Sequence, residues 1–166
     1  MTTYKRFLTL LVLMIFLAGC GDDLISKSVS IPLNADYKLI PVYTLDDRSV
    51  YLNAGVTPLL FFSIEDDNAK ETLLDIQQMV TELKPQRPLV YIATNFQTSD
   101  VSQAIENVKT FINDNNFSGT VVIQAGDPQT YVKNVPALVS LDGENPKIIE
   151  GKPGREQLSQ LLLLQP

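Results

Sequence analysis

The stretch from residue 57 to residue 84 constrains the fold more than any other part of the chain. It begins with the apolar run Leu59–Phe62, and a short apolar run bounded by polar residues is typical of a strand buried on both faces. Apolar residues then recur at helical spacing, at Ala69, Leu73, Ile76, Val80 and Leu83. Pro85 ends this pattern because proline cannot continue a helix. The stretch predicts one half of a βαβ unit, with a tight turn at residues 63–68 where functional residues are often found.

The apolar patterns on either side predict the rest of an α/β domain. The acidic and amide residues 65–68 suit the start of the first helix, and Asp100 with Gln103 predicts a capping box at the start of a second one. We expect two short strands within residues 37–52, strands at 88–94 and 119–124, a helix from Val101 to Ile112, a hairpin of residues 137–141 and 147–150, and a closing helix at 154–164.

Composition excludes several classes of function. The net charge of −6 argues against nucleic acid as a partner, since phosphates require a basic surface. The chain has no histidine, which removes the commonest general base and the commonest transition-metal ligand. Its one cysteine, Cys20, cannot form an intramolecular disulfide or a Cys-x-x-Cys site. We therefore expect neither an enzyme nor a bound cofactor.

The first twenty residues resemble the signal of a bacterial lipoprotein. Lys5 and Arg6 precede an apolar run at residues 7–18 that is too short to span a bilayer comfortably, and Leu17-Ala18-Gly19 lead into Cys20. The resemblance implies cleavage before Cys20, diacylglycerol on its sulfur and a further acyl chain such as palmitate on its amino group. The protein would then be held at the extracytoplasmic face of a membrane, inner or outer. An uncleaved anchor and ordinary signal cleavage remain alternatives.

The following segment predicts a tether between membrane and domain. Residues 21–36 are polar and show no periodic pattern. A first edge strand at residues 31–33 fits the same pattern equally well. The predicted organisation is a signal peptide at 1–19, a tether at 20–36 and one folded domain at 37–166.

Two motifs resemble thioredoxin-like proteins of the membrane-anchored, cytochrome-maturation and redoxin type. The first is Pro41-Val42-Tyr43-Thr44-Leu45, followed by Asp46-Asp47, Val50 and Leu52, ahead of Pro58-Leu59-Leu60-Phe61-Phe62. The second is Tyr131-Val132, Asn134-Val135-Pro136-Ala137 and Asp142-Gly143. The resemblance covers residues 36–164 and implies a thioredoxin-like α/β fold, with a central mixed β-sheet flanked by helices and an N-terminal β-hairpin extension. It also implies a cis peptide bond before Pro136.

The chain departs from that family at the active site. The family's Cys-x-x-Cys would fall at about Asp66 and at Asn68 or Ala69, where this chain has Glu65-Asp66-Asp67-Asn68-Ala69. A helix N-terminus stabilises a thiolate there and stabilises carboxylates as anions in the same way. Carboxylates cannot exchange disulfides, so this departure from the family's motif implies a redox-inactive domain.

Three functions of different classes remain. The first is a protein-binding or chaperone-like module that uses Ile64, Glu65, Asp66 and Asp67 together with the backbone of Val135 beside Pro136, by strand addition. The second is an enzyme that uses the acidic turn, although no nucleophile or base accompanies it. The third is a small-molecule or divalent-cation-binding lipoprotein that uses residues 65–67, although three adjacent acids rarely converge on one ion. The plainest interpretation of these acids is a solvated helix start.

Overall fold

The computed structural model describes residues 39–124, 132–141 and 147–163. The predicted signal peptide, the tether, Cys20, Tyr131 and the turn at 142–145 lie outside the described residues. The elements, in chain order, are β1 (Leu39–Tyr43), β2 (Ser49–Asn53), β3 (Leu59–Phe62), α2 (Ala69–Leu83), β4 (Val90–Ala93), α3 (Val101–Asp114), β5 (Thr120–Gln124), β6 (Ala137–Ser140), β7 (Lys147–Glu150) and α4 (Arg155–Leu162). The predicted elements are confirmed in order and type, with ends that shift by a few residues.

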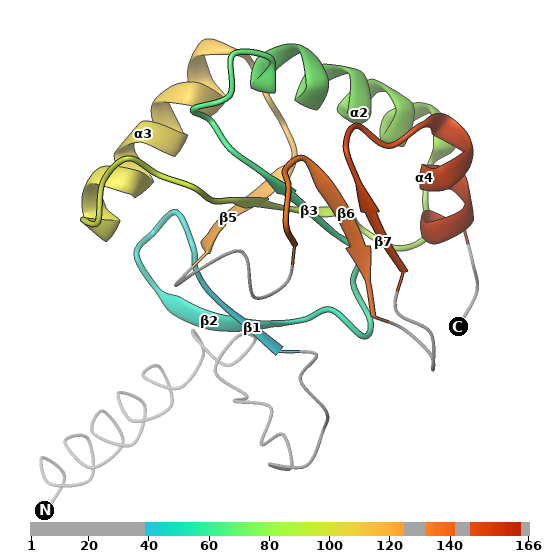
Figure 1. The fold of residues 1–166 in the computed structure, drawn as a ribbon, viewed down its shortest axis with the longest axis horizontal. Helices are drawn as coiled ribbons and strands as arrows, with labels where there is room; N and C mark the ends of the chain where they lie inside the picture. The colour runs from blue at the N-terminus through green and yellow to red at the C-terminus, as the bar shows by residue number, and fades with distance from the viewer. Residues whose placement is uncertain (1–38, 125–131, 142–146, 164–166) are drawn as a thin grey trace, which may run out of the picture. The chain divides into compact units, whose positions relative to one another are not determined.

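The described strands form one mixed sheet of seven, in the order β2-β1-β5-β4-β3-β6-β7 (Figure 1). Strands β3, β4 and β5 are parallel, so their carboxyl ends share one edge of the sheet. Strand β6 is antiparallel to β3, with Phe61 opposite Ala137. The residues after β3 and those before β6 therefore meet at the same edge. Strands β1 and β2 form the predicted N-terminal hairpin.

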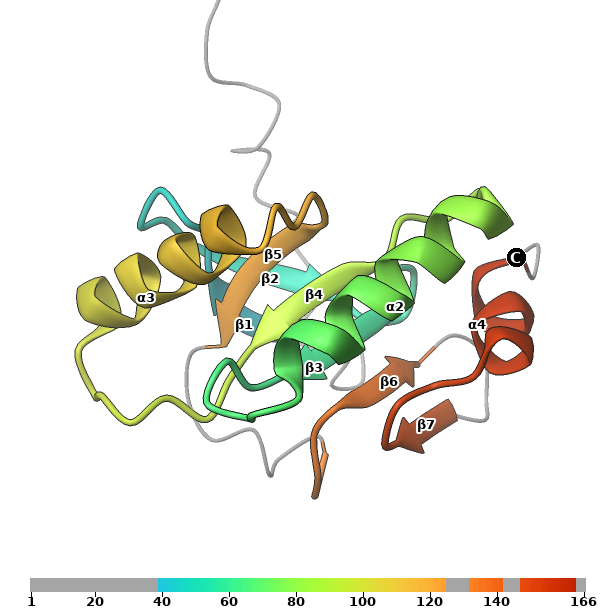
Figure 2. The same ribbon diagram turned by 90° about the horizontal axis from the view of Figure 1, so that it is seen from above.

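The core lies on both faces of the sheet. On one face, apolar side chains of α2, α3 and α4 pack with alternate residues of the strands, among them Leu60, Phe62 and Tyr91. Figure 2 shows α2 and α3 crossing this face, with α4 at its β7 side. On the other face a second cluster joins the intervening strand residues, such as Phe61 and Ile92. Strands β3 and β4 are buried at every position, because both of their faces are covered.

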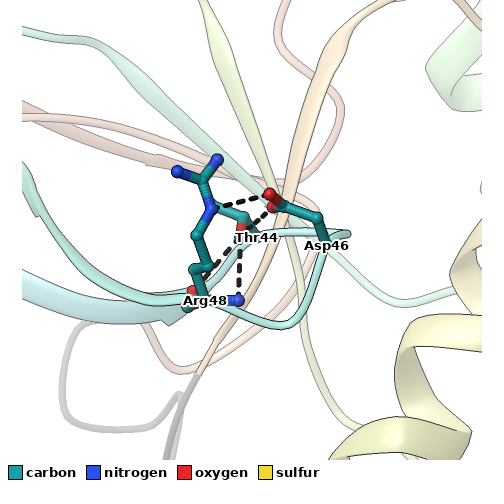
Figure 3. Close-up of polar contacts among 3 residues, drawn as sticks. All are labelled: Thr44, Asp46 and Arg48. Carbon is teal, nitrogen blue, oxygen red and sulfur yellow. Dashed lines mark hydrogen bonds and ion pairs between the residues drawn. The ribbon is translucent and has the colours of Figure 1, made fainter. Parts of the chain in front are cut away.

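A polar network closes the turn between β1 and β2 (Figure 3). The Thr44 hydroxyl donates to Asp46 and accepts the backbone N–H of Arg48 at 3.1 Å, while Arg48 Nε lies 2.6 Å from Asp46 Oδ2. The Thr44 hydroxyl, followed by Arg48, lowers the pKa of Asp46 below its ordinary value of 3.8. Threonine and aspartate side chains commonly bond the backbone or each other in tight turns, and Thr44 and Asp46 do so here.

Only half of the predicted capping box forms at the start of α3. The Asp100 carboxylate accepts the backbone N–H groups of Ser102 at 2.9 Å and Gln103 at 3.4 Å. The Gln103 side chain donates to Asn107 instead of returning to Asp100. The Asp100 N–H donates to the Thr98 hydroxyl at 3.1 Å. Thr98 therefore supplies the acceptor that Gln103 would have supplied in a capping box.

Candidate functional site

The turn after β3 is largely exposed and is held by hydrogen bonds between its own side chains and backbone. Ser63 is 7% exposed, and its hydroxyl accepts the N–H of Glu65 at 3.2 Å. Asp66 Oδ1 accepts the N–H of Asn68 at 2.9 Å, which is an Asx turn. The side chains of residues 65–68 are exposed. Their carboxylates face solvent, and no described group binds them from across the site.

The start of α2 differs from the sequence prediction in one respect. Asn68 occupies the N-cap position, but its side chain makes no capping hydrogen bond. Glu71 is the acidic residue within the first helical turn. The helix begins instead with main-chain bonds, from Ala69 N–H to the Asp66 carbonyl at 2.9 Å and from Thr72 N–H to the Asn68 carbonyl at 3.0 Å. Asn68 therefore does not cap the helix through its side chain, while the prediction of an exposed acidic turn at the helix start is confirmed.

The loop before β6 is anchored to the end of β7. The Glu150 carboxylate accepts the backbone N–H of Lys133 at 2.8 Å and the side-chain amide of Asn134 at 2.9 Å. The Gly151 N–H donates to the Pro136 carbonyl at 2.7 Å. The Val135–Pro136 peptide bond is cis, as predicted. These contacts fix residues 133–136 from the side facing β7.

The hydrogen bonds to Glu150 also lower the pKa of its carboxyl group. The Asn134 side chain, followed by the Lys133 backbone N–H, holds the pKa of Glu150 below its ordinary value of 4.5. The carboxylate is therefore charged at neutral pH and accepts all of these donors. Charge-assisted hydrogen bonds of this kind are stronger than neutral ones.

The two halves of the predicted surface meet at the carboxyl edge of β3. The pairing of Phe61 with Ala137 brings the turn at 63–68 next to the loop at 133–136, and Figure 1 shows β6 starting beside the end of β3. Ile64 is half-buried and packs on the helix-side core, while Val135 is half-buried and packs on the opposite core cluster. Within the described residues, the backbone N–H and carbonyl of Val135 form no hydrogen bond.

The acidic turn does not form a metal site in the described structure. Residues 39–124, 132–141 and 147–163 contain no group of three acidic or sulfur side chains placed to hold an ion. In the same ranges, no helix is long and apolar enough to cross a membrane.

Solved structures share this architecture. The pneumococcal exposed lipoprotein thioredoxin Etrx1 from Streptococcus pneumoniae is similar with a TM-score of 0.56 at 16% identity, over 75% of this chain and 97% of that one. StoA from Bacillus subtilis matches with a TM-score of 0.52 at 21% identity, over 74% and 94%. A thiol-disulfide oxidoreductase from Bacteroides fragilis matches with a TM-score of 0.54 at 14% identity, over 75% and 94%. The chain has the thioredoxin-like fold. No protein-family model matches the sequence, and no curated protein matches it either.

This thioredoxin-like domain has carboxylates where the resemblance places the redox motif. Asp66 is exposed and Ala69, the first residue of α2, is 6% exposed. The single cysteine of the chain is Cys20, far from this turn in sequence. The site can offer main-chain groups, one apolar side chain and negative charge.

Sequence reasoning missed Glu150 as a residue of this site. Glu150 lies 16 residues after Asn134 and reads as the last residue of an ordinary edge strand. A sequence signal existed, since a charged residue that ends a short strand beside a glycine can reach a neighbouring loop. Only the pairing of β6 with β7 identifies that loop as residues 133–136.

Proposed function

We propose that the thioredoxin-like domain is redox-inactive and binds an extended segment of another protein at the surface formed by residues 64–67 and 135–136. It would act as a protein-binding or chaperone-like module. It would not act as an enzyme, because carboxylates replace the sulfur groups that disulfide exchange requires.

The observation that supports this proposal is the open backbone of Val135, in the loop that the pairing of Phe61 with Ala137 brings next to the turn of Ile64. A main-chain N–H and carbonyl without partners in the described structure, at the edge next to β3, can pair with an extended peptide. Ile64 supplies apolar contact, and its packing on the core fixes its position before a partner arrives. Strand addition of this kind uses no catalytic cysteine, so it is compatible with the acidic turn.

The charge of the turn defines the kind of partner. Glu65, Asp66 and Asp67 are all exposed and lie next to the proposed peptide position. They favour a basic partner and repel an acidic one. Because they are exposed, salt screens this attraction, and association should weaken as ionic strength rises.

The proposed location is the extracytoplasmic face of a membrane, through acyl chains on Cys20. This part rests on the sequence resemblance of residues 1–20, and the structurally similar Etrx1 is named an exposed lipoprotein. Mass spectrometry of the membrane-extracted protein should show loss of residues 1–19 and a diacylglyceryl mass on Cys20. A mature chain that starts elsewhere, without lipid, would contradict it.

The surface is tested by crosslinking in cells, followed by mass spectrometry of the proteins recovered. Ile64→Arg and Asp67→Lys should each reduce recovery of the same partners. Asp67→Lys should leave the melting temperature nearly unchanged, while Ile64→Arg removes packing on the core and should lower it without unfolding the domain. Ile148→Arg on β7 and Asp114→Lys at the end of α3 make the same chemical changes at exposed positions elsewhere and should leave recovery intact. Equal recovery from all four variants would show that this surface is not the binding site.

A further inference from the structure

A cavity of about 480 Å³ lies at the carboxyl edge of β4 and β5, on the side of these strands away from β6. One wall is the segment that leaves β4 and runs out to the start of α3 (Figure 2). Tyr43, at the end of β1, and Ile123 of β5 form another part of the lining. The volume is within the range of small-molecule sites in proteins. The cavity shares no lining residue with the surface proposed above, and its assignment does not rest on that proposal.

The charge of the described lining favours a cation. Asp100 lines the cavity, and no described lysine or arginine does. The carboxylate repels an anion and attracts a cation, while the positive end of the α3 dipole, equivalent to about half a charge, only partly offsets this attraction. Asp100 is exposed, so solvent and salt screen its charge. We therefore expect selectivity for a cation, with a modest affinity that falls as the salt concentration rises.

The Asp100 carboxylate keeps one oxygen available for a ligand. Its Oδ1 accepts the backbone N–H groups of Ser102 at 2.9 Å and Gln103 at 3.4 Å. Its Oδ2 forms no hydrogen bond or ion pair with any described residue. Both oxygens of a carboxylate carry lone pairs that accept hydrogen bonds. The same side chain can therefore cap α3 and accept a hydrogen bond from a bound cation.

Much of the remaining lining is polar and can accept hydrogen bonds. It includes the hydroxyl and amide side chains of Thr94, Asn95, Thr98, Ser99 and Gln124. Hydroxyl and amide oxygens are acceptors, and a primary ammonium group has three donors and no acceptor. Such a group can bond to the carboxylate and to neighbouring oxygens at the same time. A quaternary ammonium ion has no N–H donor and would leave these acceptors unused.

Two aromatic side chains contribute to the apolar part of the lining. Tyr43 and Phe96 line the cavity and are half-buried. Aromatic faces attract cations electrostatically, and the methylene groups that carry an ammonium group pack on apolar surface. Ile123 and Ala104 add buried apolar surface. These contacts suit a short alkyl chain that ends in an ammonium group.

We propose that this cavity binds a primary alkylammonium ion, whose ammonium group bonds to Asp100 and whose alkyl chain packs on Tyr43 and Phe96. The ion can be a free amine or the side chain of a lysine in another protein. Both sources present the same alkyl chain and the same three N–H donors to the cavity.

Three compounds of similar size that differ in charge test the proposal: n-butylammonium, n-butanol and butyrate. The full chain is kept in a mild nonionic detergent at constant ionic strength, and amide NMR shifts are followed. n-Butylammonium should give saturable shifts centred on residues 94–104 and Ile123, weaker at high salt, and the other two compounds should bind more weakly. Absence of saturable shifts, shifts centred on the acidic turn at 65–67, or equal binding of n-butanol or butyrate would overturn the proposal.

A matched pair of variants separates this site from general attraction to an acidic protein. Asp100→Asn removes the charge and keeps the helix cap, because asparagine and aspartate cap helices about equally well. n-Butylammonium should then bind about two- to fivefold more weakly, the effect of losing one exposed charge pair. Asp114→Asn removes the same charge at the other, exposed end of α3 and should leave binding unchanged. Equal binding by the two variants would contradict the contact with Asp100.

The aromatic contact has its own test. Phe96→Leu keeps an apolar side chain and removes the ring, so n-butylammonium should bind about two- to fivefold more weakly, the usual effect of one solvent-accessible cation–π contact. The amide spectrum of the variant confirms that it is folded. Unaltered binding by the folded variant would contradict packing of the ion on Phe96.

A peptide with a central lysine, acetylated at its start and amidated at its end, distinguishes the two sources. Its lysine carries the one charge of the peptide. Tighter binding than n-butylammonium, weakened in Asp100→Asn, assigns the site to a lysine side chain of another protein. Equal or weaker binding assigns it to a free amine. Either result supports the alkylammonium site, and tighter peptide binding that Asp100→Asn leaves unchanged would count against it.

Discussion

Asn134 and Glu150 are joined by two hydrogen bonds, from the Asn134 side-chain amide to Oε2 at 2.9 Å and from its backbone N–H to Oε1 at 3.4 Å. Together with the Lys133 N–H, they fix the loop before β6 to the end of β7. Val135 follows directly, and its backbone forms no hydrogen bond within the described residues. The position of Val135 in the proposed binding surface therefore depends on Glu150, a residue outside that surface.

Removing the Glu150 carboxylate should loosen this loop without unfolding the domain. In Glu150→Ala, backbone hydrogen exchange at Lys133 and Asn134 should accelerate several-fold, because both amides lose their acceptor. Exchange in α3 should stay as it is. Lys147→Ala, on the same strand and also exposed, is the matched control. Unchanged exchange at residues 133 and 134 would show that Glu150 does not hold the loop.

The same carboxylate should contribute to acid sensitivity. Its pKa in the folded protein is held below the ordinary value of 4.5 by the Asn134 side chain and the Lys133 N–H. Its contribution to stability is therefore fully present above about pH 4.5, the unfolded value, and is lost as the pH falls through the lower folded pKa. The difference in melting temperature between the native chain and Glu150→Gln should shrink in that acid range. A difference independent of pH would contradict this assignment.

Gly119 is required for close packing of two aromatic rings. A Cβ at this position would lie 2.6 Å from Phe117 Cε1 and 2.6 Å from Tyr91 Cε2, while the two rings form an edge-on pair with centroids 4.8 Å apart. Gly119→Ala should lower the free energy of unfolding by about 1–3 kcal/mol, the usual cost of overpacking. In a Phe117→Leu background the same change should cost less. Full additivity in urea denaturation would rule out the steric explanation.

The thioredoxin-like domain should not reduce disulfides. The native full chain should fail to reduce insulin with any electron donor, because Asp66 and Ala69 stand at the start of α2 and the one cysteine is Cys20. The double variant Asp66→Cys/Ala69→Cys places two thiols at the helix N-terminus, where thiolates are stabilised, and serves as the positive control. Turnover by the native chain above a buffer blank would contradict the redox-inactive interpretation.

The elements of the fold follow from local patterns, while the contacts that shape the site do not. The run Leu59–Phe62 and the helical spacing from Ala69 onward predict β3 and α2 because burial on both faces or on one face leaves a periodic signal. The cis bond before Pro136 was implied by the resemblance to thioredoxin-like proteins. The hydrogen bonds of Lys133 and Asn134 to Glu150 depend on the pairing of β6 with β7, a property that no single segment encodes.

Side-chain capping was the least predictable local feature. Asn68 and Gln103 are both good capping residue types, but neither makes the predicted bond. Asp66 and Thr98 instead accept the backbone N–H of the residue two positions later, Asn68 and Asp100. Short polar side chains can bond several nearby amides at similar cost, so the sequence identifies the helix start but does not select the donor and acceptor.

The proposed binding surface, residues 64–67 and 135–136, is tested most directly with a photo-crosslinking amino acid. It is placed at Ile64, at Asp67 and, as a control, at Ile148 on β7. Ile64 and Asp67 belong to the proposed surface, while Ile148 is 48% exposed and lies outside it. In intact cells, the first two positions should give the same discrete protein adduct, which weakens at high salt, and position 148 should not give it. Adducts that are identical from all three positions, or absent from 64 and 67, would contradict the claim that this edge binds a protein partner.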